Sequence, residues 1–269
     1  MRRISPFLLI SLLCGAAPAG ELLNVHHTSE ALSCEMVFDV YVPDGDVPPG
    51  GWPVLYLLHG AWGNHTDWWR VTDVESVAEE CGVMLVFPDG GQFGWYLDSP
   101  VDPSSQRESY LIGEVLPLVD RTFRTRTDRE GRGICGLSMG GHGAISLAAK
   151  HPDLFGSASS LSGILDITRH GDRWELPLRL GPLEEGTESW RAHSCVYLAD
   201  RFVDADVRIF FDCGIDDTVA DAITDGRLLR DRLLELGVPY IWAEHVGAHT
   251  WDHWSEHIGE HVRWHAEGF

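Results

Sequence analysis

The stretch GICGLSMGGHGAISLAAK, residues 133–150, decides the fold of this chain. Gly133-Ile134-Cys135 has the apolar character of a buried strand, and the segment from Gly140 to Lys150 has a helical pattern. Ser138 lies between them in a G-x-S-x-G pattern. A strand, a tight glycine-flanked turn and a helix would hold the serine Oγ above the end of a parallel sheet. The stretch therefore predicts a serine nucleophile on a strained turn.

Apolar runs alternate with helical patterns along the rest of the chain, which predicts an α/β protein with a mostly parallel sheet flanked by helices. The segment from 164 to 206 breaks this rhythm, and we expect it to be an insertion over the carboxyl edge of the sheet, where ligands bind in such folds. The predicted strands are 36–42, 54–58, 83–87, 133–135, 158–161, 207–211 and 240–243, and the predicted helices are 71–81, 108–123, 140–150, 221–236 and 251–265.

The first nineteen residues have the pattern of a secretory signal peptide. Arg2 and Arg3 precede an apolar run from Phe7 to Leu13, and Ala17-Pro18-Ala19 offers small residues for cleavage before Gly20. The sequence thus predicts a secreted or periplasmic protein with a signal peptide at 1–19 and one domain at 20–269. Lipid anchoring through Cys14 is a weaker alternative, because the bulky Leu13 stands where a lipidation signal needs a small residue.

Charge narrows the classes of partner. Lys and Arg number 20 against 41 Asp and Glu, so the formal net charge is −21 in 269 residues. A nucleic-acid binder needs clustered basic side chains, and Lys150 is the only lysine, so neither nucleic acid nor an anionic membrane surface is expected as a partner.

Five cysteines follow the predicted signal peptide, an odd number that leaves at least one thiol unpaired in a monomer. Cys135 and Cys213 lie in apolar strand-like runs and are expected in the core. The sequence leaves open whether Cys34 pairs with Cys81 or with Cys195.

The partners of Ser138 should follow it in the order acid, then histidine. Asp216 and Asp217 both follow the predicted strand 207–211, and either could be the acid. His249 stands in a glycine-containing turn before the last predicted helix and would act as the base.

Two backbone N–H groups are needed to hold the oxyanion. Met139 follows the serine, and Ala61 lies in the early loop after strand 54–58, with Gly60 as the less favoured choice. His59 reads as a structural residue that hydrogen-bonds within that loop.

Five motifs extend these observations: LLHGAWGNHTDW (57–68), FGWYLDSP (93–100), GLSMGGHGA (136–144), CGIDD (213–217) and GAHTWDHW (247–254). From Val37 to Trp254 the chain resembles the esterase branch of the α/β-hydrolases, which includes tributyrin-type esterases, S-formylglutathione hydrolases, bacterial feruloyl esterases and mycolyltransferases. The resemblance implies an α/β-hydrolase fold. It selects Asp217 over Asp216 and matches the family histidine to His249.

The same resemblance matches the oxyanion donors of the family to Ala61 and Met139. It implies a serine carboxylesterase that hydrolyses short-chain acyl or aryl esters, of acetyl or feruloyl type, through an acyl-enzyme and without a cofactor. The expected partner is a small-molecule or polysaccharide-linked ester. Alternatives are a thioesterase like S-formylglutathione hydrolase, an acyltransferase, and a non-catalytic binding protein on the same scaffold.

Histidine and tryptophan are abundant, with 14 and 11 residues. From His253 to His265 every fourth residue is histidine, which we interpret as a half-exposed flank of the last helix beside a core face of Trp251, Trp254, Ile258 and Val262. No carboxylate is obviously placed as a third ligand, so no metal is expected.

Trp62 and Trp95 lie in loops at the expected active-site edge, as pocket walls or as packing residues.

Overall fold

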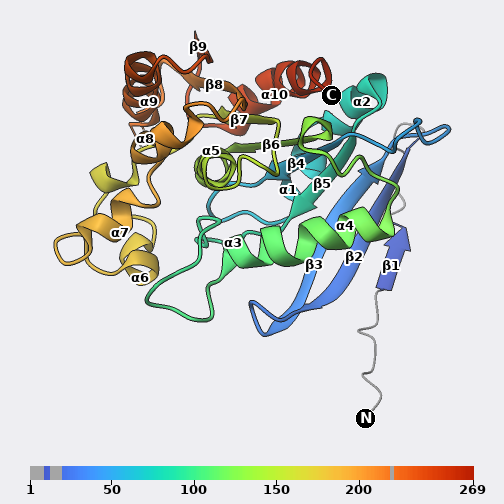
Figure 1. Cartoon of the computed structure of the whole chain (residues 1–269), viewed down its shortest axis with the longest axis horizontal. Coiled ribbons are helices and arrows are strands. Elements are labelled where there is room, and N and C mark those ends of the chain that lie inside the picture. Colours follow the sequence, from blue (N-terminus) through green and yellow to red (C-terminus); the bar gives the residue numbers. More distant parts are fainter. Residues whose placement is uncertain (1–8, 13–19, 219–220) are drawn as a thin grey trace.

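Nine strands form one sheet in the order β1-β2-β3-β5-β4-β6-β7-β8-β9 (Figure 1). The computed structural model describes residues 9–12, 20–218 and 221–269. The strands are β1 Leu9–Leu12, β2 Glu21–Ser29, β3 Cys34–Val42, β4 Val54–Leu58, β5 Met84–Pro88, β6 Arg132–Leu137, β7 Ser157–Leu161, β8 Arg208–Gly214 and β9 Ile241–His245.

The six strands from β4 to β9 are parallel, whereas β1, β2 and β3 form an antiparallel extension at one side. Every residue of β4, β5, β6 and β7 is buried, as expected for strands covered by helices on both faces. The predicted mostly parallel sheet is therefore confirmed. Strand β2 was not predicted, because its polar Asn24, His26, His27 and Thr28 interrupt the apolar pattern.

The helices lie in two layers, one on each face of the sheet (Figure 1). Residues of α1, α2 and α10 share one hydrophobic core, and residues of α4, α5, α8 and α9 share the other. The helices are α1 Asp67–Val71, α2 Val74–Cys81, α3 Arg107–Ser109, α4 Leu116–Thr122, α5 Met139–Lys150, α6 Leu176–Leu180, α7 Thr187–Arg191, α8 Cys195–Leu198, α9 Ala222–Leu236 and α10 Trp251–Ala266. Short helical turns cover Arg129–Gly131, Ile167–Arg169 and Ala199–Phe202.

Two predicted helices are interrupted in the structure. The predicted helix 71–81 is two helices, α1 and α2, which are separated at Thr72 and Asp73. The predicted helix 108–123 runs as α3, a π-helical segment Tyr110–Val115, and α4. Pro117 lacks a backbone N–H for the helical ladder, which explains why the wider π turn lies just before it.

The segment 164–206 contains α6, α7 and α8 at the left of Figure 1, and it begins beside the predicted nucleophile. The Ile164 N–H donates to the Ser138 carbonyl over 3.3 Å. Side-chain hydrogen bonds hold the segment to the body; for example, Trp95 Nε1 donates to the Trp174 carbonyl over 3.1 Å, and Ser99 Oγ donates to the Arg179 carbonyl over 2.6 Å. These contacts place the segment at the carboxyl edge of the sheet.

The predicted signal peptide falls mainly outside the described residues. Its described part, Leu9–Leu12, pairs with β2 as strand β1. Cys14 also lies outside the described residues. Within the described part of the chain the five cysteines are unpaired, and both cysteines predicted to lie in the core are buried; the five are Cys34, Cys81, Cys135, Cys195 and Cys213.

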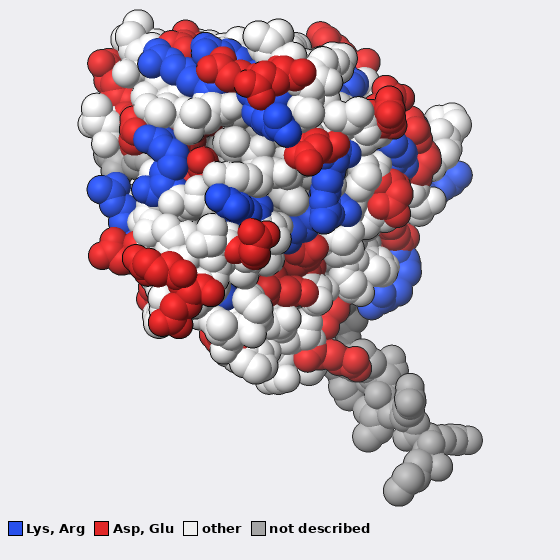
Figure 2. Space-filling model, turned by 60° about the vertical axis from the view of Figure 1, so that its left-hand side comes forward, with Lys and Arg blue, Asp and Glu red and all other residues white. Residues whose placement is uncertain are grey.

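Acidic and basic side chains alternate over the face that carries the left-hand helices of Figure 1 (Figure 2). Ion pairs such as Arg169 with Asp221 and Arg227 with Glu244 tie neighbouring segments together there. Among the helices of the described residues, none is both long and apolar enough to cross a bilayer.

Candidate active site

Ser138 sits on a strained turn between β6 and α5. Its φ of 53° and ψ of −117° put a non-glycine residue in a rare conformation, at a cost of about 1–3 kcal/mol. The surrounding backbone holds this geometry, because the Ser138 N–H donates to the Leu161 carbonyl and the Ser138 carbonyl accepts from the His142 N–H, each over 3.0 Å. The strain therefore lies at the residue that the sequence marks as the nucleophile.

Gly140 explains why this turn can lie so close to the neighbouring strand. A Cβ at Gly140 would stand 2.3 Å from the Leu58 carbonyl oxygen and 2.6 Å from that of His59. Both oxygens belong to the backbone and cannot rotate away.

We expect Gly140→Ala to lower the free energy of unfolding by about 1–3 kcal/mol, since overpacking forces the backbone to shift. It should also slow any reaction at Ser138, because the displaced backbone leads into the Ala61 loop. Urea unfolding measures the first effect. Gly113→Ala is the matched control, because a Cβ at Gly113 meets nothing within 4 Å, and this change should raise stability by about 0.5–1 kcal/mol. Equal stability of the two variants would contradict the packing argument.

The structure brings Ser138, His249 and Asp217 into one hydrogen-bonded chain. Ser138 Oγ lies 2.8 Å from His249 Nε2, and His249 Nδ1 lies 2.6 Å from Asp217 Oδ2. Asp217 follows the end of β8 and His249 lies between β9 and α10, so parallel strands deliver both side chains to the same edge. Asp216 is exposed, whereas Asp217 is fully buried, so the structure places Asp217 against the histidine.

The three side chains are largely shielded from water. Ser138 is 8% exposed, and the His249 side chain is 11% exposed. The edge of Trp254 packs against the His249 ring, with the ring planes 86° apart. A low local dielectric of this kind strengthens the interaction between a carboxylate and a histidine that gains a proton.

Cys213 contributes a contact that sequence reasoning missed. Its Sγ lies 3.7 Å from Asp217 Oδ2, and burial raises the pKa of the Cys213 thiol, which keeps it a neutral donor. The sequence placed Cys213 only in the core, and the CGIDD motif was the single signal of its nearness to the acid. The thiol therefore helps to orient the Asp217 carboxylate.

The predicted oxyanion donors belong to two segments that come close to Ser138. Met139 is the first residue of α5, and Ala61 follows β4. Within the described residues neither backbone N–H has a protein acceptor. A Cβ at Gly60 would stand 3.5 Å from Ser138 Cβ, which shows how close this loop comes to the serine.

His59 supports the Ala61 loop from inside the protein. Its Nδ1 donates to the Gly60 carbonyl over 2.8 Å, and its Nε2 accepts from the Gly90 N–H over 2.9 Å. Burial lowers the pKa of His59, which suits the neutral ring that these two bonds require. The interpretation of His59 as a loop-holding residue agrees with these contacts.

The two predicted aromatic walls differ in exposure. Trp62 has a φ of 61°, is 68% exposed and lies edge-on to Phe93 with ring centroids 4.9 Å apart. Trp95 is 1% exposed and packs against His142 and Trp174. The contacts of Trp95 are those of a packing residue, whereas Trp62 is largely exposed to solvent.

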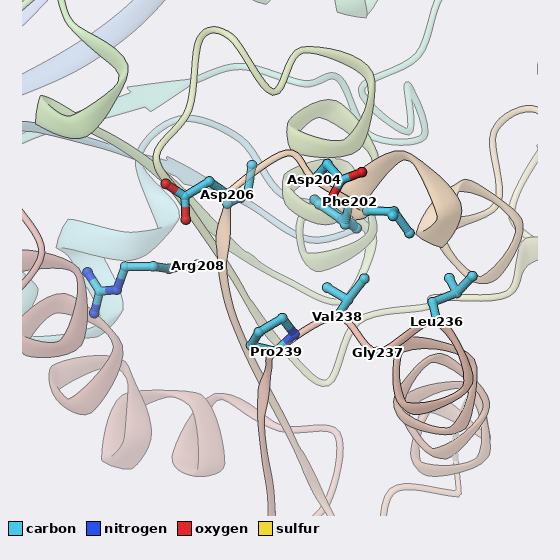
Figure 3. Close-up of a pocket in the computed structure, with 10 residues that line it drawn as sticks. Phe202, Asp204, Asp206, Arg208, Leu236, Gly237, Val238 and Pro239 are labelled. Carbon is cyan, nitrogen blue, oxygen red and sulfur yellow. The ribbon is translucent and has the colours of Figure 1, made fainter.

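A hollow of about 430 Å³ lies at the opposite edge of the sheet (Figure 3). Its lining includes Arg208, which begins β8, and Pro239, which precedes β9. Asp217 follows the other end of β8, about 20 Å away along a seven-residue strand. This hollow is therefore not part of the site around Ser138.

The histidines at every fourth position of α10 were expected to lie on a half-exposed flank of the helix. This expectation was wrong for three of the four, which are buried. His253, His261 and His265 are at most 3% exposed. His265 accommodates its burial by hydrogen bonds to Ser157 and Ser159 of β7, over 2.7 and 2.8 Å. Polar partners on the adjacent strands allow His261 and His265 to face inward, and a helix pattern alone does not show such partners.

The chain order of Ser138, Asp217 and His249, each at the end of a parallel strand, defines the class of serine hydrolases built on the α/β-hydrolase fold. Residues 29–265 match the model of the Esterase family, which is described as "Putative esterase". The chain therefore belongs to the Esterase family, a group of carboxylic ester hydrolases. The predictions of fold and family are confirmed.

Relatives of known name cover the chain to different extents. An esterase of Mycobacterium tuberculosis is 38% identical over 138 residues, which are 49% of this chain and only 30% of the relative. The chain thus matches less than a third of the length of that relative. S-formylglutathione hydrolase of Bos taurus is 27% identical over 266 residues, which are 90% of this chain and 92% of the relative.

Solved structures of similar proteins share nearly the whole fold. An S-formylglutathione hydrolase from Agrobacterium tumefaciens has a TM-score of 0.84 and 27% identity, and the match covers 97% of this chain and 99% of the other. A ferulic acid esterase has a TM-score of 0.78 and 25% identity, with 93% and 99% covered.

Proposed function

We propose that this protein is a serine carboxylesterase that acts through Ser138, His249 and Asp217. The hydrogen-bonded chain from Ser138 Oγ through His249 to Asp217 is the single observation that carries the proposal. Family membership supports it, because an esterase needs an activated nucleophile, and this hydrogen-bonded chain at the carboxyl edge supplies one.

The reaction proceeds in two acyl-transfer steps. Ser138 Oγ attacks the ester carbonyl carbon while His249 Nε2 takes the hydroxyl proton, and Asp217 holds the opposite N–H of the ring. The negative oxygen of the tetrahedral intermediate accepts from the N–H groups of Ala61 and Met139. His249 returns the proton to the departing alcohol, which leaves an acyl-enzyme. Water then attacks the acyl-enzyme carbonyl while His249 takes its proton, and His249 passes this proton to Ser138 Oγ as the bond to the acyl group breaks and the acid leaves. No cofactor is needed for these steps.

The proposed substrates are short-chain acyl or aryl esters, of acetyl or feruloyl type, free or linked to polysaccharide. The exposed indole of Trp62 supports an aromatic or sugar contact beside the Ala61 loop. A second candidate is a thioesterase, which the extended similarity to S-formylglutathione hydrolases favours. The same groups would serve both reactions, because a thiol replaces the alcohol as the leaving group.

A panel of substrates tests the proposal. We expect p-nitrophenyl acetate and butyrate to be hydrolysed faster than longer esters, with a burst of p-nitrophenol equal to one per enzyme when deacylation is slow. Methyl ferulate and an S-acyl glutathione, assayed at equal concentration, distinguish aryl ester from thioester specificity. Added alcohol acceptors reveal acyl transfer through a new ester product. Absence of turnover on every ester and thioester would favour a non-catalytic binding protein.

We also propose that the protein is exported. The paired arginines Arg2 and Arg3, the apolar run and the small residues before Gly20 support export through a cleaved signal peptide. N-terminal sequencing of the protein from the medium or periplasm should begin at Gly20. An uncleaved chain in the cytosol would contradict export, and a lipid-modified Cys14 would show anchoring instead.

A further inference from the structure

Three side chains of the types that bind metal ions converge beside the loops that carry Asp217 and His249. They are Asp212 on β8, His245 at the end of β9 and His257 on α10. One ligand atom from each lies within 4.8 Å of the others. The rings of His245 and His257 stack with centroids 3.9 Å apart, and His245 Nε2 lies 3.5 Å from Asp212 Oδ2.

We propose that Asp212, His245 and His257 bind a divalent transition metal of the zinc class. Two imidazole nitrogens and one carboxylate oxygen suit Zn²⁺ and its neighbours, whereas Ca²⁺ and Mg²⁺ prefer oxygen alone. A tetrahedral zinc site with bonds of about 2.0–2.1 Å holds its ligands about 3.4 Å apart. In the structure the three ligand atoms lie within 4.8 Å of one another, so metal binding requires the two half-buried histidine side chains to move closer to Asp212. This site is separate from ester hydrolysis and does not depend on it.

Buried polar atoms without partners point to a ligand at this cluster. Asp212 is 2% exposed, and its Oδ1 has no hydrogen-bond partner among the described residues. His253 is 3% exposed, lies with its ring 4.6 Å from that of His257, and has neither nitrogen hydrogen-bonded within the same part of the chain. Folded proteins nearly always satisfy such groups, and a cation held by Asp212, His245 and His257 would account for the open Asp212 oxygen.

The environment already prepares Asp212 as a ligand. His261 is fully buried, its ring stacks on Phe210 at 4.0 Å, and its Nε2 lies 3.2 Å from Asp212 Oδ2. Metal-binding carboxylates are commonly oriented by a hydrogen bond of this kind.

A metal here would join the elements that hold the proposed catalytic loops. Asp212 lies on the strand that leads to Asp217, and the His245 carbonyl accepts from the Ile215 N–H over 2.8 Å. His257 lies on the helix that follows His249. The bound ion would therefore connect β8, β9 and α10, and its binding energy would stabilise the folded state.

The test is calorimetric titration of ZnCl₂ into untagged full-length protein that has been stripped with a chelator and dialysed. We expect one zinc per chain, and a rise in the unfolding midpoint of about 5–10 °C when zinc is at about 100 times its Kd. His245→Gln and His257→Gln should each weaken binding by at least about tenfold, since loss of even an outer partner of a metal ligand costs that much. Bound Co²⁺ should show the visible absorption of a tetrahedral site.

His26→Gln is the matched control, because it removes a histidine from β2, at the other side of the sheet, and should leave zinc binding unchanged. Circular dichroism checks that each variant is folded. The absence of saturable binding would overturn the proposal. Equal zinc affinity of wild type and His257→Gln would also overturn it, and zinc inhibition that persists in that variant would place the ion at His249 instead.

Discussion

Replacing Ser138 with alanine should lower kcat/KM for p-nitrophenyl acetate by about 10⁴- to 10⁶-fold, because no other group can form the acyl-enzyme. KM should change little, since Ser138 contributes to bond making rather than to general substrate binding. The remaining rate reflects the oxyanion N–H groups and substrate positioning. A fluorophosphonate probe should label the wild type at Ser138 and fail to label the variant.

Ser146→Ala is the control for loss of a serine from the same helix. Ser146 Oγ donates only to the Gly143 carbonyl within α5, and alanine is a better helix former. Its activity should stay within about twofold of the wild type, because it lies two turns beyond the nucleophile. Comparable activity of wild type and Ser138→Ala would overturn the proposed mechanism.

Asp217→Asn should lower kcat by about 10³- to 10⁴-fold without disturbing the fold. Asp217 Oδ2 accepts a hydrogen bond from the Nδ1–H group of His249 over 2.6 Å. The ring proton therefore stays on Nδ1, and Nε2 is free to accept a hydrogen bond from Ser138. An asparagine amide can donate to Nδ1 instead, which moves the ring proton to Nε2 and blocks proton transfer. Stopped-flow or steady-state ester hydrolysis at constant pH measures the loss.

Asp216→Asn separates this effect from the loss of an acid in the same loop. The Asp216 side chain is exposed, and its backbone N–H donates to the Gly247 carbonyl over 2.9 Å, a bond that the substitution keeps. Activity within about threefold of the wild type is expected, as for a typical surface change. A larger loss in Asp216→Asn than in Asp217→Asn would show that the wrong aspartate has been assigned.

Local patterns predicted most of the sheet and its helices, because buried parallel strands and amphipathic helices are readable from neighbouring residues. Strand β2 was missed, since its alternating polar residues do not resemble a buried strand. The π-helical turn before Pro117 was also missed, because a helical period does not show how the ladder adapts to a missing N–H.

The proposed active site was predicted more completely than its surroundings. Motifs placed Ser138, His249, Ala61 and Met139, but two adjacent aspartates satisfied the spacing from the strand, and resemblance to a family was needed to choose between them. The support of Cys213 for the acid became visible only when β8 and its loop were folded.

By itself, the sequence determined the strand–turn–helix unit at Ser138, the order of its partners and the esterase family, because each can be read from short motifs and their order along the chain. Only the tertiary structure decided the inward histidines of α10 and the meeting of Asp212 with His245 and His257. Those side chains come from three separate elements. Their distances depend on which strands are paired and on how α10 packs against the sheet, and no local pattern encodes either.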